Sequence, residues 1–218
     1  MRLSPAAEDC LLLVHRMRER QETASTSRLA RALGVTDSTV TAMVQKLSGL
    51  HLLQRPEKRV VTLTAKGETL ARQLIRRHRL IESYLHEFLA YAWEEVHAEA
   101  ERLEHAVSER FVEAISERLG NPAVDPHGGP IPDRQGHVTN RKLVRLSDAA
   151  AGTKGRVARV ISEQTDLLVY LTELGMKLGA AVHVLDVPPH DHVTRVRLRQ
   201  KEVTIGQQVA AQVLIEVT

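Results

Sequence analysis

Histidine and glutamate recur at a spacing of four in one segment of the 218-residue chain. His97, Glu101 and His105 are each four positions apart, and Glu104 directly precedes the last of them. On an α-helix each step of four residues rotates by about 40°, so these side chains would share one slanting stripe. Imidazole nitrogens and carboxylate oxygens gathered on one helix face are typical ligands of divalent cations. The spacing therefore indicates a metal site.

Two further segments offer ligands of the same kind. His78 and Glu82 are again four apart, and Asp9 lies on a separate predicted helix. A lone pair of this kind is usually a solvated ion pair, so the prediction depends on the combination of segments. Nitrogen and oxygen donors suit octahedral Mn²⁺ or Fe²⁺ and can also hold Zn²⁺ or Co²⁺. Cys10 is the one residue that could add a thiolate. We expect Mn²⁺, with Fe²⁺, Zn²⁺ and Co²⁺ as alternatives.

Charge is unevenly distributed along the chain. Residues 1–75 hold 12 Lys and Arg against 7 Asp and Glu, a net charge of +5, whereas residues 76–120 hold 6 against 10, a net charge of −4. A basic first third suits a polyanionic partner, and an acidic middle third suits cations. There is no apolar run of about 20 residues and no apolar signal-peptide stretch, and one cysteine excludes an internal disulfide. We expect a cytoplasmic protein without a membrane partner.

The first 120 residues carry mostly helical patterns. Ser4 as N-cap and Pro5 in the first turn predict a helix over residues 4–19. A long helix is expected from Thr64 towards Ala90, and one further helix over residues 93–119.

Two short helices, residues 27–33 and 37–48, are joined by a turn that contains Gly34 and predict a helix-turn-helix. Its expected core is Leu29, Ala30, Leu33, Val35, Val40, Val44 and Leu47. The opposite face offers polar side chains for DNA, namely Thr36, Ser38, Thr39, Thr41, Gln45 and Lys46. Residues 54–64 then predict a wing whose cations are Arg55, Lys58 and Arg59. The alternative is a winged helix used only for protein contacts.

The chain changes character after a loop-rich stretch. Gly120–Gly136 holds four of the eight prolines and predicts a linker. Short β-type runs follow, at residues 142–146, 155–162, 180–187, 193–200, 202–205 and 213–217, with one helix near residues 166–175. Such closely spaced strands predict a small barrel and an α+β protein overall. The expected domains are a winged helix-turn-helix (1–70), a helical metal-binding and dimerisation domain (71–120), a linker (121–141) and a small β-barrel (142–218).

These segments together resemble the diphtheria toxin repressor family of metal-dependent transcriptional regulators, specifically its manganese transport regulator branch. The resemblance rests on VTDSTVTAMVQKLSGLHLL, the wing, TAKGETLARQLIRRHRLIESYL, EEVHAEAERLEH and DPHGGPIP, and covers nearly the whole chain. It implies that the C-terminal module is the family's SH3-like domain, a ferrous-transport-A-like fold.

The resemblance also implies two groups of metal ligands. The site that triggers DNA binding corresponds to Asp9, His78, Glu101, Glu104 and His105. Iron-responsive members carry methionine and cysteine at the positions of Asp9 and Glu101, and Leu12 stands where the manganese branch has another carboxylate. The second site corresponds to Glu82, His97, Asp125 and His127, with Glu163 or Gln164 completing it; relatives often carry Cys-Pro-His-Gly where this chain has DPHG.

The expected function is that of a homodimeric, non-enzymatic repressor that binds double-stranded operator DNA of metal-uptake genes when loaded with a cation. The cation would favour one arrangement of the two DNA-reading units, and metal strengthens DNA binding only through that preference. The candidate dimer seam is Leu85, Phe88, Leu89, Val107, Phe111 and Ile115, which could instead be intrachain core. Two other functions stay open: a metal-independent winged-helix regulator that senses an organic ligand, and a metallohydrolase, which would need an open coordination position and a general base.

Overall fold

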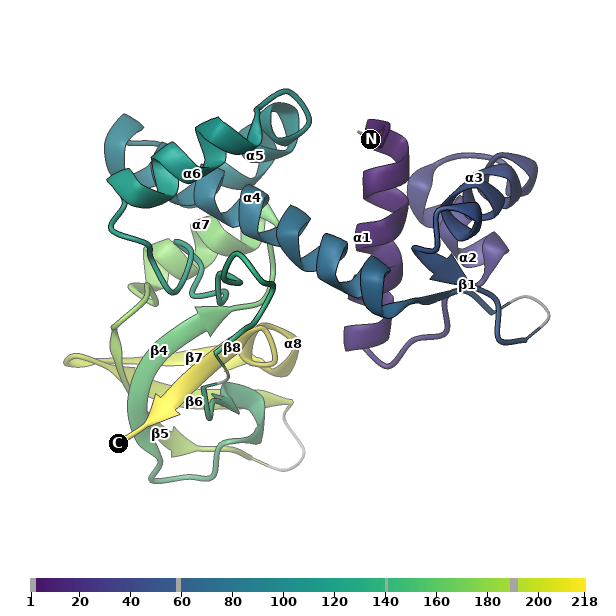
Figure 1. Cartoon of the computed structure of the whole chain (residues 1–218). Coiled ribbons are helices and arrows are strands. Elements are labelled where there is room, and N and C mark those ends of the chain that lie inside the picture. Colours follow the sequence, from purple (N-terminus) through teal and green to yellow (C-terminus); the bar gives the residue numbers. More distant parts are fainter. Residues whose placement is uncertain (1–2, 58–59, 140, 189–191) are drawn as a thin grey trace. The chain divides into compact units, whose positions relative to one another are not determined.

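The computed structural model describes residues 3–57, 60–139, 141–188 and 192–218 (Figure 1). The chain divides into two compact units. Unit 1 comprises Met1–Arg77 with Pro132–Val138, and unit 2 comprises His78–Ile131 with Thr139–Thr218. Two of the predicted wing cations, Lys58 and Arg59, lie outside the described residues. Among the described residues, no helix combines the length and apolar character needed to cross a membrane.

Unit 1 is the predicted winged helix-turn-helix. It contains α1 (Pro5–Glu19), α2 (Thr26–Leu33), α3 (Asp37–Gly49), the two-stranded antiparallel sheet of β1 (Leu53–Gln54) and β2 (Thr62–Leu63), and the first half of α4 (Ala65–Leu89). Gly34 ends α2 in the left-handed conformation, with a φ of 65°, which glycine adopts without a steric penalty. Thr36 then caps α3 by accepting a hydrogen bond from the backbone N–H of Thr39.

The core of unit 1 follows the predicted helix faces with one exception. Leu29, Val40, Val44 and Leu47 are fully buried. Val35, predicted in the same core, is 39% exposed, so that prediction was wrong. Val35 directly follows the Gly34 turn, where the chain leaves the helical path, so helix periodicity does not apply to it.

The helical part of unit 2 corrects another prediction. In place of one helix over residues 93–119, the chain forms α5 (Val96–Glu104) and α6 (Glu109–Arg118). The break has a local cause: the Ser108 hydroxyl accepts a hydrogen bond from the N–H of Phe111 at 3.2 Å and starts a new helix. Both helices pack against the second half of α4 through Leu80, Ile81, Leu85, Val96, Ala100, Val112 and Ile115.

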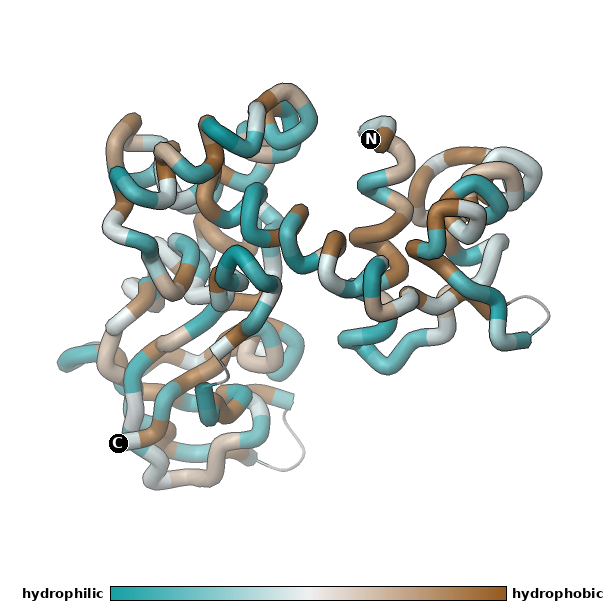
Figure 2. The backbone as a smooth tube through the Cα atoms, in the orientation of Figure 1, coloured by the Kyte–Doolittle hydropathy of each residue, from teal (hydrophilic) through white to brown (hydrophobic). Residues whose placement is uncertain are grey.

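The C-terminal part of unit 2 is a six-stranded antiparallel sheet in the order β3-β8-β4-β5-β6-β7. Its strands are β3 (Val144–Arg145), β4 (Lys154–Val160), β5 (Ala181–Asp186), β6 (Val193–Leu198), β7 (Lys201–Gly206) and β8 (Val213–Val217), with a short 3₁₀ turn (Leu146–Asp148) and helices α7 (Thr165–Leu174) and α8 (Gln207–Ala210) between them. The strands carry both hydrophobic and hydrophilic residues (Figure 2), and buried and exposed positions alternate in β6. The predicted α+β, SH3-like architecture is confirmed.

The proline-rich linker is bonded to its surroundings at several points. The side chain of Arg72 donates to the carbonyl of Gly136 at 3.1 Å, within unit 1. In unit 2, the segment Asp125–Gly129 lies against β4: the N–H of Val160 donates to the carbonyl of His127 at 2.8 Å. Gly128 has a φ of 80°, and a Cβ atom there would lie 2.1 Å from the carbonyl oxygen of Ala158. The loop is therefore packed against the sheet along its backbone.

Candidate functional site

Three ligand atoms meet where α4 and α5 pack together in unit 2. His78 Nε2 lies 3.0 Å from Glu82 Oε1 and 3.0 Å from His97 Nδ1, and His97 Nδ1 lies 3.2 Å from Glu82 Oε1. The i,i+4 spacing on α4 places His78 beside Glu82, and His97 stands in the first turn of α5. The side chains are 9%, 3% and 15% exposed, respectively.

Hydrogen bonding alone does not satisfy this triangle. A hydrogen bond needs one donor and one acceptor, and three mutual neighbours cannot alternate between the two roles, so one side always joins atoms of like character. A shared cation removes the conflict because all three atoms then donate electron pairs to it. Bonds of about 2.1 Å at octahedral right angles place neighbouring ligands about 3.0 Å apart, against about 3.4 Å for a tetrahedral site. The observed sides of 3.0 to 3.2 Å match one face of an octahedron.

The electrostatics of the group favour positive charge. Burial disfavours the charged form of His78, but hydrogen bonds to Glu104 and Glu82 outweigh it and raise the pKa of His78 to about 10. Burial also opposes ionisation of Glu82, yet hydrogen bonds to His78 and His97 hold its pKa below the usual range. The pKa of His97 is raised because its bond to Glu82 and the charge of Glu163 outweigh burial. The buried carboxylates therefore need cationic partners.

His78 adjoins a second group through its other ring nitrogen. His78 Nδ1 lies 2.8 Å from Glu104 Oε2, and His105 Nε2 lies 3.7 Å from Glu104 Oε1. Glu104 thus lies beside both His78 and His105, two residues that the resemblance assigns to the same site. Asp9 belongs to unit 1, so its place beside this group stays a prediction.

Two predicted ligands contact the outer edge of His97. Glu101 Oε1 and Glu163 Oε2 both lie 3.4 Å from His97 Nε2, whereas Nδ1 of the same ring belongs to the triangle. Their side chains are 58% and 44% exposed. Both glutamates therefore lie on the solvent side of the histidine.

Asp125 and His127 form a third group with Glu82: their ligand atoms lie within 4.8 Å of one another. Asp125 Oδ1 accepts hydrogen bonds from the N–H groups of His127 at 2.8 Å and Gly129 at 2.9 Å, and its Oδ2 lies 3.1 Å from Nε of Arg79. Burial and the nearby Glu82 raise the pKa of Asp125 despite Arg79. The carboxylate is thus already held from three sides.

Two residues of this site carry no sequence signal of function. Arg79 binds Asp125, and the backbone carbonyl of Trp93 accepts a hydrogen bond from His127 Nε2 at 2.7 Å. A single arginine within a helix, or a single tryptophan before one, has no spacing pattern that would indicate these partners.

The predicted DNA-facing side chains lie on one face of α3 and on the wing. Thr36, Ser38, Thr39, Gln45 and Lys46 are exposed and Thr41 is half-buried. Several of the hydroxyls already have local partners. Thr36 Oγ1 lies 2.8 Å from the Ser38 hydroxyl and 2.9 Å from the Thr39 hydroxyl, and Thr41 donates to the carbonyl of Asp37.

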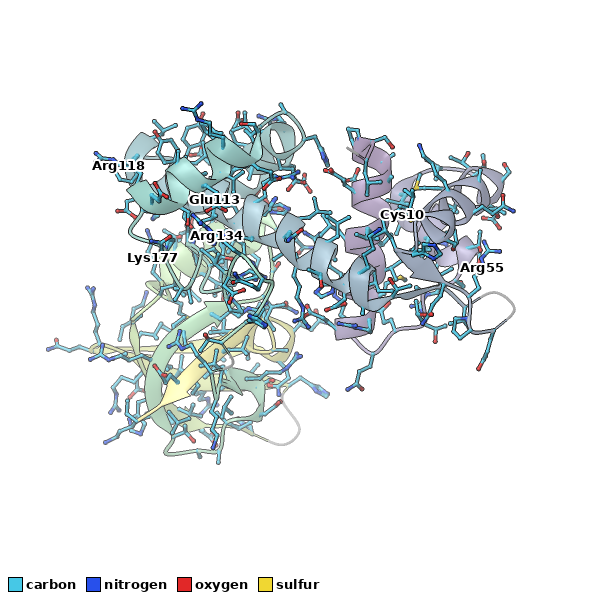
Figure 3. The ribbon with its side chains drawn as sticks, in the orientation of Figure 1. Cys10, Arg55, Glu113, Arg118, Arg134 and Lys177 are labelled. Atoms are coloured by element: carbon cyan, nitrogen blue, oxygen red, sulfur yellow. The ribbon has the colours of Figure 1, made fainter. Side chains whose placement is uncertain are left out.

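Gln45 and Arg55, two of the predicted DNA-facing residues, border a hollow. Arg55 lies in the exposed segment that follows β1 (Figure 3). A hollow of about 510 Å³ is lined by Gln45, Ser48, His51, Leu53, Gln54, Arg55 and Thr64. Gln45 of α3 and Arg55 of the wing segment therefore line the same hollow.

The family comparisons cover nearly the whole chain. Residues 2–59 match "Iron dependent repressor, N-terminal DNA binding domain", residues 64–133 match "Iron dependent repressor, metal binding and dimerisation domain", and residues 144–217 match the FeoA domain. The iron-dependent repressor IdeR of Mycobacterium leprae is 31% identical over 98% of both chains. The regulator MntR of Bacillus subtilis is 33% identical over 46% of this chain and 70% of its own.

Solved structures agree with this assignment. A manganese-dependent transcriptional repressor in complex with manganese superposes with a TM-score of 0.88 at 34% identity, covering 97% of this chain and 100% of that one. The manganese regulator SloR gives a TM-score of 0.78 at 32% identity, covering 99% and 100%. The chain therefore belongs to the diphtheria toxin repressor family of iron- and manganese-dependent transcriptional repressors.

Proposed function

We propose that this protein is a homodimeric repressor that binds double-stranded operator DNA when it holds a divalent cation, and that Mn²⁺ is the activating ion. Its place of action would be the cytoplasm and its targets metal-uptake genes. The observation that carries the proposal is the triangle of His78 Nε2, Glu82 Oε1 and His97 Nδ1, whose sides of 3.0 to 3.2 Å suit an octahedral ion.

Among Mn²⁺, Fe²⁺, Zn²⁺ and Co²⁺, the chemistry of the candidate ligands supports Mn²⁺. The candidate donors are oxygen and nitrogen atoms, which suit manganese, whereas the side chain of Cys10 is fully buried in the apolar core of unit 1. Intrinsic affinity would still rank Zn²⁺ above Mn²⁺. Geometry and supply in the cell would therefore decide which ion acts.

We assign two ligand sets to the chain. The resemblance assigns His78 to the site that triggers DNA binding, but we group it with Glu82 and His97 because its Nε2 atom lies in the triangle. These three residues would hold one ion, with His127 and Asp125 beside Glu82 and with Glu163 beside His97. Asp9, Glu101, Glu104 and His105 would form the site that controls DNA binding, with His78 in contact with Glu104. A bound cation would supply the positive charge that lets these carboxylates approach one another. The protein side chains set which arrangement of the chain that charge stabilises.

An exposed apolar face supports the dimer. Phe88 is 37% exposed, Leu89 53% and Phe111 44%, whereas Leu85 and Ile115 of the predicted seam are buried within the protomer. The exposed and the buried residues of the predicted seam all lie within residues 64–133, the range that matches the metal binding and dimerisation domain. We propose Phe88, Leu89 and Phe111 as the centre of the dimer contact.

The test is a DNA-binding titration with matched glutamate variants. An operator is first selected from random duplexes with Mn²⁺-loaded protein. Asp9→Ala and Glu101→Ala should abolish Mn²⁺-dependent binding in a gel shift without changing the melting temperature. Glu99→Gln, on the same helix as Glu101 but paired with Arg102, should bind as the wild type does. Counting bound ions per chain with Mn²⁺, Fe²⁺ and Zn²⁺ tests the choice of metal.

Two results would contradict the proposal. If both alanine variants responded normally to Mn²⁺, the controlling ligands would be misassigned. If chelator-treated protein bound the operator as tightly as Mn²⁺-loaded protein, a metal-independent regulator would be the better description.

A further inference from the structure

Trp93, the single tryptophan of the chain, contacts both the second metal site and the C-terminal domain. Its ring stacks on the ring of His127, with centroids 5.7 Å apart and an angle of 28° between the planes. Its indole N–H donates to the hydroxyl of Thr172 in α7 at 2.7 Å. The side chain is 5% exposed and belongs to the hydrophobic core of the C-terminal sheet.

The carbonyl of Trp93 determines which nitrogen of the His127 ring carries the hydrogen. A backbone carbonyl can only accept a hydrogen bond, and His127 Nε2 lies 2.7 Å from it, so Nε2 carries the hydrogen. In the neutral ring, Nδ1 then holds the free electron pair. His127 is 5% exposed and shares a ligand group with Glu82 and Asp125. Nδ1 is therefore the atom that the ring can offer to a cation.

The C-terminal domain makes two further hydrogen bonds to the backbone of His127 and of Glu94, the residue next to Trp93. The N–H of Val160 in β4 donates to the carbonyl of His127 at 2.8 Å, and the hydroxyl of Thr165 in α7 donates to the carbonyl of Glu94 at 3.3 Å. Together with the bond from Trp93 to Thr172, these contacts fix both the backbone that carries the ligand and the carbonyl that orients it.

We propose that Trp93 is a positioning residue of the second metal site: its carbonyl fixes the Nε2–H form of His127, and its indole anchors that carbonyl to α7. This inference rests on the proposed function, because it assumes that a cation binds beside Glu82. It makes the affinity of the second site depend on the packing of the C-terminal domain, through a residue that is not a ligand. Partners of this kind, which orient a ligand, commonly change metal affinity by about 10- to 100-fold.

The first test reads the ring of His127 directly. Full-length protein with ¹⁵N-labelled histidine is examined by NMR without metal and with Zn²⁺ alone, and the signals of His127 are identified with His127→Gln. The expected result is hydrogen on Nε2 in both states, with Zn²⁺ shifting the Nδ1 resonance. Hydrogen on Nδ1, or a Zn²⁺ shift at Nε2, would overturn the proposal.

The second test weakens the anchor and then restores it. Thr172→Val removes the acceptor of the indole N–H, whereas Thr172→Ser keeps a hydroxyl at the same place. The probe is Mn²⁺, and the readout is quenching of Trp93 fluorescence, with the phase due to the second site identified as the one lost in His127→Ala. We expect Thr172→Val to weaken that phase by about 10-fold and Thr172→Ser to restore most of the affinity. Equal affinities for all three proteins would overturn the proposal.

The two proposals fail in different ways. If His97→Ala and wild-type protein bind the same number of Mn²⁺ ions with the same affinity, the proposed metal site itself is wrong. If His97→Ala loses an ion while Thr172→Val binds as the wild type does, the site stands and only the role of Trp93 is refuted.

Discussion

Asp125 is a buried carboxylate whose partners determine what it can do. It accepts hydrogen bonds from two backbone N–H groups and contacts Arg79, whose side chain is 20% exposed. Removing one member of a buried ion pair leaves the other charge buried and unpaired. The resulting loss of stability is larger than the net stabilisation that the pair provides. The residue therefore contributes to the stability of the loop in the absence of metal, besides any role as a ligand.

We expect Asp125→Asn and Arg79→Gln each to destabilise the metal-free protein by about 2 to 3 kcal/mol. The double variant should cost at least about 1 kcal/mol less than the sum, because both groups are then absent. Urea unfolding in the presence of a chelator measures these values. Arg197→Gln, which breaks an exposed pair with Glu202, is the control and should cost less than about 1 kcal/mol. Additive losses would show that the two residues act independently.

Glu68 gives unit 1 a defined dependence on pH. Burial raises the pKa of Glu68, but hydrogen bonds from Arg18 at 2.7 Å and His15 at 3.2 Å outweigh it, so the pKa lies below its usual range. A carboxyl with a lowered folded pKa stabilises the fold above its unfolded pKa of about 4.3. That contribution is lost as the pH falls through the folded pKa.

The variant Glu68→Gln should therefore be less stable than the wild type by about 1 kcal/mol at neutral pH. The difference should close as the pH falls below about 4, through the folded pKa of Glu68. Urea unfolding at a series of pH values checks this. A difference as large at about pH 3 as at neutral pH would contradict the assignment, and Glu216→Gln, in an exposed pair with Arg141, serves as the control.

At the scale of single residues, the sequence predicted which candidate ligands are neighbours better than it predicted the residues that hold them in place. The spacing of four placed His78 with Glu82 and His97 with Glu101, since both pairs depend on local helix geometry alone. The contacts of His127 with Trp93 and of Asp125 with Arg79 depend on how the loop packs against distant elements. Local periodicity carries no information on such contacts.

At the scale of the element, α3 shows how one side chain can serve two purposes. The Thr36 hydroxyl, predicted to contact DNA, accepts the N–H of Thr39 at 3.2 Å and starts the helix. Loss of such a cap costs about 1 kcal/mol, whereas Asp at the same position keeps the hydrogen bond.

We therefore expect Thr36→Ala to lower the stability of the protein by about 1 kcal/mol and Thr36→Asp to leave it unchanged. In a gel shift, Thr36→Asp should bind DNA more weakly than Thr36→Ser, because it adds a negative charge on the face that meets phosphates. Thermal melting and the gel shift separate the two roles. Unchanged DNA affinity for Thr36→Asp would place this end of α3 away from the DNA backbone.

Most elements followed from the sequence because their signals are local. Periodicity predicted all six strands of the C-terminal sheet and the long helix α4. The break between α5 and α6 was missed because Ser108 is compatible with a helix interior until its hydroxyl caps the next turn. Helix α8, of four residues, was missed because it is too short to show a period.

At the scale of the whole molecule, the exposed face of α4 and α6 needs a partner. Phe88, Leu89 and Phe111 present apolar surface to solvent, and the guanidinium of Arg118 lies 4.9 Å from the centre of the Phe88 ring. An exposed cluster of large apolar side chains usually marks an interface.

Leu89→Glu should therefore convert a dimer into a monomer of 24.3 kDa in sedimentation equilibrium, and it should weaken operator binding without lowering the metal content. Val169→Glu, at another exposed apolar position in α7, is the control and should stay dimeric. A dimeric Leu89→Glu protein would place the interface elsewhere.

The close approach of Gly128 to β4 restricts which sequences this protein can tolerate. Any side chain at Gly128 would begin 2.1 Å from the carbonyl oxygen of Ala158, whereas a Cβ atom at Gly120, with a similar φ of 73°, would meet none of the described atoms within 4 Å. In a saturation library selected for repression, position 128 should return glycine alone, and position 120 should also accept asparagine. The substitutions that this loop tolerates at its glycines are thus set by the space available for a Cβ atom, and not by the chemistry of its ligands.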